Sequence, residues 1–111
     1  LIAGGSDKRL NFGPLAKWIG ETESLRGVVL LPGTGTDRLR QMLRHSWVKS
    51  SRNMAEAVDQ ALHIAHADDA LILSPACASF GLFANEFDRG NQFVACLTER
   101  GLRLLGSQAP I

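Results

Sequence analysis

The stretch Leu71-Ile-Leu-Ser-Pro-Ala-Cys-Ala-Ser-Phe80 decides the fold, because it joins a buried strand to a loop of small residues. The apolar run from Ala70 to Leu73 predicts the strand, which ends at Ser74-Pro75 because proline has no N–H for a sheet ladder. Small residues continue to Ser79, and in open α/β sheets ligands bind at this carboxyl edge of the strands. We therefore expect a ligand-facing loop with hydrogen-bond donors at Ser74 and Ser79.

Strand and helix patterns alternate along the rest of the chain. Further strands are predicted at the start of the chain up to Gly4-Gly5, over residues 25–31 and around residues 47–48. Helices are predicted from near Pro14 to Gly20, after Thr36, behind an Asn53–Glu56 capping box, and over about residues 89–100. Such alternation is typical of βαβ units, so we predict a single α/β domain over residues 1–111, a three-layer Rossmann-like fold with a mainly parallel sheet.

The helical periodicity also predicts which side chains are buried. Apolar residues at spacings of three and four are expected inside, namely Phe12, Leu15, Trp18, Ile19, Leu39, Met42, Leu43, Val58, Ala61, Leu62, Ala65, Phe93, Val94 and Leu97. Asn11 is a plausible N-cap for the first helix. A solvated helix face is expected to carry Arg38, Arg40 and Arg44. After Gly101, an edge strand is conceivable at Leu102, Leu104 and Leu105.

The overall composition excludes several classes of function. With 45% hydrophobic and 21% charged residues the chain is typical of a globular domain, and its net charge of +1 gives no basis for a nucleic-acid or acidic-membrane partner. No apolar run reaches the roughly 18 residues of a membrane span, and no signal peptide is visible. Cys77 and Cys96 lack a metal-ligand spacing, so we expect reduced cysteines in a cytosolic protein. The start at Leu1, without methionine and inside an apolar run, suggests a piece of a longer protein.

Lys8 is the first candidate for ligand binding. It follows a predicted strand end and two glycines, so it lies at the same sheet edge as the loop at residues 74–79 if the strands are parallel. A lysine there is a suitable point charge for a carboxylate or a phosphate. From the spacing alone, a solvated loop lysine is the favoured interpretation.

Two weaker candidates have simpler explanations. Gly33-Thr-Gly35 suggests a phosphate loop, but it lacks the third glycine of a dinucleotide fingerprint and the Gly-Lys-Ser/Thr of a P-loop, so turn chemistry is favoured. Cys77 would be a nucleophile if a histidine acted as its base, but no oxyanion or Gly-x-Ser-x-Gly pattern accompanies it. A packing role is therefore favoured for Cys77 over a pair with His45, His63 or His66.

Two segments together match a known family. The first is Ser-Pro-Ala-Cys-Ala-Ser-Phe at residues 74–80, continued by Phe83, Asn85 and Arg89-Gly90. The second is Gly-Gly-Ser-Asp-Lys at residues 4–8, continued by Asn11-Phe12 and Pro14-Leu15. Both resemble the C-terminal domain of the Mur ligases of bacterial cell-wall synthesis, in particular the members that add D-glutamate. A common ligand would bring these distant segments together.

The resemblance implies a function in peptidoglycan precursor synthesis in the bacterial cytoplasm. In this family, ATP and Mg²⁺ convert the terminal carboxylate of UDP-N-acetylmuramoyl-L-alanine into an acyl phosphate, which the amine of D-glutamate attacks to form an amide. This chain would be most of the amino-acid-binding domain. ATP, Mg²⁺ and the UDP-linked substrate would be bound mainly by the remaining domains of the same ligase. The domain's first strand, with an Asp-Ser-Lys-Ala-Thr-Asn segment, would precede Leu1.

The resemblance also implies which residues bind D-glutamate. Lys8 matches the lysine that binds D-glutamate and Ser79 the serine that bonds one of its carboxylates, whereas Phe80 and Glu86 match the loop that closes on the amino acid. Gly81 stands where the family often has aspartate, and the order Glu86-Phe87 reverses a common Phe-Glu order. A contact through the main-chain N–H of Glu86 would tolerate this reversal, whereas a side-chain contact would not. No catalytic or metal-binding residue is assigned to the chain.

A stand-alone Rossmann-like module is the alternative, either a nucleotide binder or a protein-interaction domain. Such a module would use Gly33-Thr-Gly35 as its site and would leave Lys8 without a role. Ligand titration separates the two interpretations, because D-glutamate would perturb Lys8 and Ser79, whereas a nucleotide would perturb Gly33.

Overall fold

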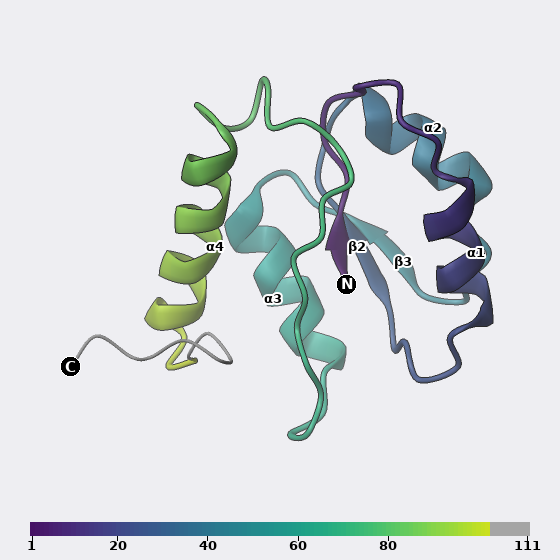
Figure 1. Cartoon of the computed structure of the whole chain (residues 1–111). Coiled ribbons are helices and arrows are strands. Elements are labelled where there is room, and N and C mark those ends of the chain that lie inside the picture. The colour runs from purple at the N-terminus through teal and green to yellow at the C-terminus, as the bar shows by residue number, and fades with distance from the viewer. Residues whose placement is uncertain (103–111) are drawn as a thin grey trace.

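The computed structural model describes residues 1–102, in which strands and helices alternate (Figure 1). The strands are β1 (Ile2–Ala3), β2 (Val28–Leu30) and β3 (Val48–Ser50). The helices are α1 (Gly13–Glu21), α2 (Thr34–Met42), α3 (Met54–Ile64) and α4 (Glu86–Glu99). The strands are parallel and neighbours in the order β1-β2-β3, with Val29 paired to Ile2 on one side and Lys49 on the other. The predicted α/β fold with a parallel sheet is confirmed.

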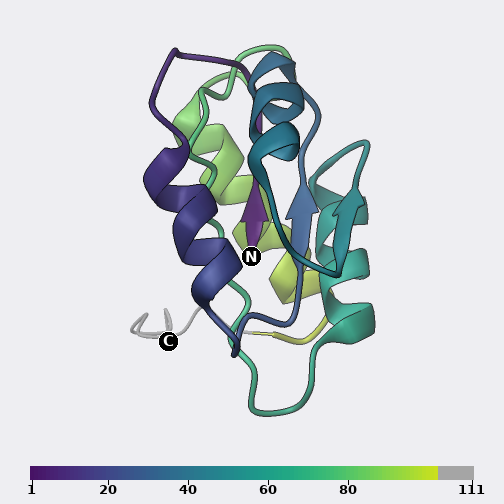
Figure 2. The ribbon, with the colours of Figure 1, turned by 90° about the vertical axis from the view of Figure 1, so that its right-hand side faces the viewer.

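The sheet lies between two helical layers, α1 and α2 on one face and α3 and α4 on the other (Figure 2). Because successive side chains of a strand point to opposite faces, β1 and β2 each contribute to both cores. The core under α3 and α4 contains Ile2, Val29, Leu31, Val58 and Phe93. The core under α1 and α2 contains Ala3, Val28, Leu30, Ile19 and Leu39. Strands that are apolar on both faces are typical of such covered parallel sheets.

The strand predicted over residues 70–73 is only partly formed. The segment runs parallel to β1, since the Ile2 N–H donates to the Ile72 carbonyl (2.8 Å) and the Ser74 N–H to the Ile2 carbonyl (3.0 Å). Residues 70–73 form only one isolated bridge, between Leu73 and Ile2, and no continuous ladder. Beyond it, the Gly4 N–H donates to the carbonyl of Pro75 (2.8 Å). The next residue, Ala76, has a φ of 59°, and the chain changes direction there. The ladder therefore stops at the proline, as predicted.

Side-chain caps fix where two helices begin. The prediction that Asn53 caps α3 is confirmed, because its side chain accepts from the Glu56 N–H at 2.8 Å. For α4, the predicted start at residue 89 is wrong. Asn85 caps the helix by accepting from the Asp88 N–H at 2.8 Å, so α4 begins at Glu86.

Some side chains expected inside are on the surface. Trp18, Met42 and Val94 are 46%, 38% and 38% exposed. They lie at the margin of each apolar face, because the side chains buried beside them in the sequence are Ile19, Leu43 and Phe93. Helical spacing predicts which face of a helix is apolar, but it does not predict how wide a strip of that face is covered by the sheet.

Other corrections concern the ends of elements. Asn11 does not cap α1, whose N-cap is Phe12 without a side-chain hydrogen bond. β2 is shorter than the predicted residues 25–31. Leu102 lies in no strand, and the rest of the expected edge strand, Leu104 and Leu105, lies outside the described residues. Among residues 1–102, no helix has both the length and the apolar character needed to cross a membrane.

Candidate functional site

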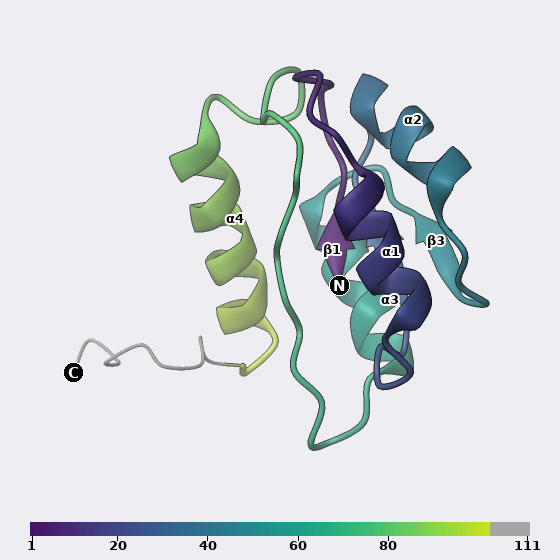
Figure 3. The ribbon, with the colours of Figure 1, turned by 45° about the vertical axis from the view of Figure 1, so that its right-hand side comes forward.

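Two loops meet at the carboxyl edge of the sheet (Figure 3). The lysine loop (residues 4–10) follows β1, and the serine loop (residues 74–80) follows the extended segment beside β1. Ser6 and Ala78 exchange backbone hydrogen bonds of 3.0 and 2.9 Å, and the Ser6 hydroxyl donates to the Phe80 carbonyl at 2.6 Å. Lys8 and Ser79 therefore lie in loops that are bonded directly to each other.

Glycines let the lysine loop pack against the start of α2. Gly33, the N-cap of α2, has a φ of 151°, and a Cβ atom on it would lie 2.2 Å from the carbonyl carbon and oxygen of Gly5. The N–H groups of Gly35 and Thr36 donate to the same carbonyl at 2.9 and 3.3 Å. These groups are therefore occupied and do not form the anion site that a free helix N-terminus offers. Gly33-Thr-Gly35 thus has a packing role, which argues against a nucleotide site there.

Side chains of α2 hold the lysine loop in place. Thr36 is only 5% exposed. Its hydroxyl accepts from the Gly5 N–H at 2.9 Å and donates to the carbonyl of Leu31. Thr34 accepts from the Asp7 N–H at 2.9 Å. Arg38 pairs with the Asp7 carboxylate through Nη2–Oδ1 and Nε–Oδ2 contacts of 2.8 and 3.2 Å. The residue that precedes Lys8 is therefore fixed through both its backbone and its side chain.

Arg38 lies outside the core, as predicted, but its side chain is paired and only partly solvated. Besides pairing with Asp7, its guanidinium donates to the Leu10 carbonyl at 2.8 Å and lies 4.1 Å from the centre of the Phe12 ring. The hydrogen bond from Arg38, with a further bond from the Arg9 N–H, holds the pKa of Asp7 below its ordinary value. Sequence reasoning missed this pair because its members are 31 residues apart. The remaining arginines of that predicted face are exposed, namely Arg40 and Arg44.

The serine loop is held from α4. Arg89 donates from Nη1 to the Cys77 carbonyl at 2.8 Å, and the Ser79 carbonyl accepts from the Phe83 N–H at 3.0 Å. Ser79 is 9% exposed, and none of the side-chain hydrogen bonds among residues 1–102 involves its hydroxyl. This hydroxyl is therefore available as a donor or acceptor for a ligand.

The other predicted site residues differ in how closely they are tied to these loops. Lys8 is exposed and forms no ion pair with any residue from 1 to 102. Phe80, in the serine loop, is 76% exposed. Glu86 is exposed at the start of α4, and no hydrogen bond in the described part of the chain joins it to either loop. The structure thus joins the loops that carry Lys8, Ser79 and Phe80 directly, whereas Glu86 lies on α4, which is bonded to the serine loop through Arg89.

Cys77 has the environment of a packing residue. It is 1% exposed, and burial, with a smaller contribution from Asp7, raises the pKa of its thiol. A thiolate is the reactive form of cysteine, so this shift disfavours a nucleophilic role. His45 contacts the Leu25 carbonyl at 2.7 Å, not the cysteine. Within residues 1–102, no group of three or more His, Cys, Asp or Glu side chains is arranged to hold a metal ion.

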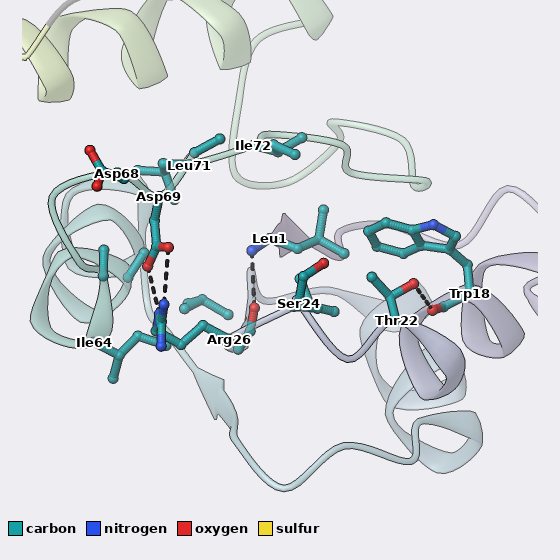
Figure 4. Close-up of a pocket in the computed structure, with 16 residues that line it drawn as sticks. Leu1, Trp18, Thr22, Ser24, Arg26, Ile64, Asp68, Asp69, Leu71 and Ile72 are labelled. Atoms are coloured by element: carbon teal, nitrogen blue, oxygen red, sulfur yellow. Dashed lines mark hydrogen bonds and ion pairs between the residues drawn. The ribbon is translucent and has the colours of Figure 1, made fainter.

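A separate hollow of about 310 Å³ lies at the opposite edge of the sheet (Figure 4). Residues before β1, before β2 and after α3 line it, including Leu1, Trp18, Arg26 and Asp69. Arg26 is the only cationic side chain in this described lining, and Asp69 neutralises it at an Nε–Oδ2 distance of 2.6 Å. Within residues 1–102, a side-chain cation without an ion-pair partner is therefore found at the loop edge, at Lys8, and not in this hollow.

Comparison with curated proteins identifies relatives of one kind. The chain is 45% identical over 100 residues to the UDP-N-acetylmuramoylalanine–D-glutamate ligase of Roseiflexus sp. (strain RS-1), covering 84% of the chain and 21% of that protein. It is 41% identical over 99 residues to the ligase of the same name from Nitrosospira multiformis, covering 87% of the chain and 20% of that protein. For the Ralstonia nicotianae ligase of that name the identity is 39% over 110 residues, covering 94% of the chain and 21% of that protein.

These matches extend along most of the chain, although no protein-family model matches it. The chain spans about one fifth of the length of the curated relatives. The resemblance to Mur ligases noted in the sequence is confirmed, since every one of these relatives carries the name of the D-glutamate-adding ligase. By sequence, the chain is therefore similar to one part, about a fifth of the length, of UDP-N-acetylmuramoylalanine–D-glutamate ligases.

Proposed function

We propose that the chain is most of the C-terminal, amino-acid-binding domain of a UDP-N-acetylmuramoylalanine–D-glutamate ligase, and that its two joined loops bind D-glutamate. The observation that carries the proposal is the hydrogen bonding between Ser6 and Ala78, which brings together the segments of Lys8 and Ser79. These are the two segments that match the family. Because the chain spans only a fifth of its relatives, the activity of the complete enzyme is part of the proposal.

The chemistry of D-glutamate suits the two loops. The amino acid carries two carboxylates, and an ammonium such as that of Lys8, which forms no ion pair within residues 1–102, makes strong, charge-assisted hydrogen bonds with a carboxylate. The Ser79 hydroxyl would supply a second donor, and we expect the exposed ring of Phe80 to close over the bound ligand. Holding both carboxylates would leave the amine directed at the acyl group, and such positioning lowers the barrier to amide formation.

ATP and Mg²⁺ belong to the proposed reaction, but the residues described here do not fit them. The sequence has no Gly-x-x-x-x-Gly-Lys-Ser/Thr, and the N–H groups of Gly35 and Thr36 at the start of α2 are bonded to Gly5. Within residues 1–102 no carboxylate cluster is arranged for a metal ion. We therefore assign ATP, Mg²⁺ and UDP-N-acetylmuramoyl-L-alanine to the remaining domains of the proposed ligase, which would act in the bacterial cytoplasm.

The proposal is tested by NMR titration of the 111-residue chain with D-glutamate, and separately with L-glutamate and ADP. We expect D-glutamate to shift the amide signals of Asp7, Lys8, Ala78 and Ser79, and Lys8→Ala to abolish these shifts. Shifts centred on Gly33 and Gly35 with ADP, and none at Lys8 with D-glutamate, would instead support a nucleotide-binding module. The Lys17→Ala variant, with the same loss of charge on α1, is the control.

A further inference from the structure

Asp7 places a negative charge directly beside the cation assigned to the ligand. A carboxylate next to Lys8 has two unfavourable effects on a dianionic amino acid, because it repels the ligand and competes for the lysine ammonium. In the structure both effects are reduced, since the Asp7 carboxylate is hydrogen-bonded to groups other than Lys8. Its Oδ1 accepts from the Arg9 N–H at 2.8 Å and from Arg38 Nη2 at 2.8 Å, and its Oδ2 accepts from Arg38 Nε at 3.2 Å.

Arg38 is well placed to hold this carboxylate. It projects from α2, which is fixed against the lysine loop by the bonds of Thr34 and Thr36. Its guanidinium also donates to the Leu10 carbonyl and stacks on Phe12, so the contacts of this side chain span both ends of the segment around Lys8. Lys8 itself forms no ion pair within residues 1–102.

We propose that Arg38 is a positioning residue for the amino-acid site: it neutralises and holds Asp7, and thereby leaves the Lys8 ammonium free for a carboxylate of the ligand. The inference rests on the proposed function, because it presupposes that Lys8 binds D-glutamate. Arg38 does not itself touch the ligand, and its charge is already paired. Its effect therefore falls on ligand affinity and not on the chemical step.

The test uses the complete ligase of the proposed function and varies D-glutamate at saturating ATP and UDP-N-acetylmuramoyl-L-alanine. We expect Arg38→Ala to raise KM for D-glutamate by about ten-fold with little change in kcat, the range typical of a charge-assisted interaction. Arg40→Ala, which removes the same charge from an exposed position of α2, should leave KM unchanged. A circular dichroism melt of each variant shows that the fold is retained.

Removing the charge of Asp7 distinguishes this role of Arg38 from purely mechanical support of the loop. If Arg38 acts by holding Asp7 away from Lys8, Asp7→Asn alone is tolerated, and the Arg38→Ala/Asp7→Asn double variant recovers KM to within about three-fold of the unmodified enzyme. If Arg38 only braces the loop, Asp7→Asn is itself harmful, and the double variant is at least as impaired as Arg38→Ala. That second outcome would overturn the inference.

Lys8→Ala separates failure of the inference from failure of the proposed function. If Lys8→Ala raises KM for D-glutamate and Arg38→Ala behaves like Arg40→Ala, the site assignment stands and only the inference is wrong. If Lys8→Ala has no effect on KM, the proposed function fails, and with it the basis of the inference. Support for both requires that Arg38→Ala raises KM clearly less in the Lys8→Ala background than alone, because only the repulsion between Asp7 and the ligand then remains for Arg38 to relieve.

Discussion

Cys77 lies at the centre of the serine loop, between the residues proposed to bind the ligand and the core beneath them. Its side chain packs with Ala3 and Leu39, and a Cβ atom on Gly35 would lie 2.8 Å from its sulfur. Cys77 is therefore a buried packing residue of the serine loop. At the residue scale, the chemistry that we propose is binding by Lys8 and Ser79, and not covalent catalysis.

Replacing Cys77 tests whether its thiol takes part in the reaction. We expect Cys77→Ser to leave turnover of the complete ligase largely intact, because the thiol attacks nothing. The buried hydroxyl should lower the free energy of unfolding by about 1–3 kcal/mol if it finds no partner, and Cys77→Ala serves as the apolar control. Steady-state turnover and urea denaturation measure the two effects. A loss of several orders of magnitude in turnover by a folded variant would revive the nucleophilic interpretation.

At the scale of elements, the site depends on the close packing of the lysine loop on the start of α2. Gly33 adopts a φ of 151° against the carbonyl of Gly5, a position with no room for a Cβ atom. Gly90, in α4, has nothing within 4 Å of a Cβ atom placed on it. These two glycines therefore form a matched pair, one required by packing and one not.

We expect Gly33→Ala to destabilise the protein by about 1–3 kcal/mol or more, because the methyl group overlaps backbone atoms that cannot move without breaking the loop. Gly90→Ala should be neutral or stabilising by up to about 1 kcal/mol, as alanine is favoured in a helix interior. Urea denaturation of the two variants measures the difference. Equal stability of the two would show that the loop does not pack on α2 as described.

The sequence indicates elements and loops well where a local pattern determines them. Asn53 with Glu56 predicts the start of α3, and Pro75 predicts the end of the extended segment. The α4 start was predicted three residues late because the cap at Asn85 was not recognised as one. The pairing of Arg38 was missed for a different reason: its partner Asp7 is distant in the sequence, so periodicity shows only that the side chain faces away from the core.

At the scale of the whole molecule, ion pairs tie elements that are distant in the sequence. Asp7 pairs with Arg38, and the other long-range pairs of the described residues are Arg26–Asp69 and Arg100–Asp59. A hydrogen bond from the arginine is the main cause that lowers the pKa of each aspartate. Each folded-state pKa therefore lies below the unfolded value of about 4.

These shifts predict the direction of the pH dependence of stability. The contribution of each pair is complete above about pH 4, where the aspartate is ionised in both states, and it is lost as the pH falls through the lowered folded-state pKa. We expect the melting temperature to fall below about pH 4, with each exposed pair contributing little. Asp69→Asn should reduce the fall, and a melting curve series from pH 7 to pH 2 measures it. An unchanged series in Asp69→Asn would exclude that aspartate as a cause.

The 111-residue chain is also expected to have no ligase activity by itself. Its sequence has no P-loop, and the glycines that most resemble a phosphate loop are packed against Gly5. Incubation with ATP, Mg²⁺, D-glutamate and UDP-N-acetylmuramoyl-L-alanine should therefore release no ADP above a blank. Measurable ADP release by the purified chain would contradict the assignment of nucleotide binding to other domains.

The central claim is that Lys8 and Ser79, brought together by the joined loops, bind D-glutamate. Its most direct test is steady-state kinetics of the complete ligase with Lys8→Ala, varying each substrate in turn. We predict that Lys8→Ala lowers kcat/KM for D-glutamate by about ten- to a hundredfold, as expected for a lost charged hydrogen bond of roughly 1.5–3 kcal/mol, with far smaller changes for the other substrates. Ser79→Ala should act in the same direction, non-additively with Lys8→Ala. An unchanged KM and kcat/KM for D-glutamate in the Lys8→Ala enzyme would contradict the claim.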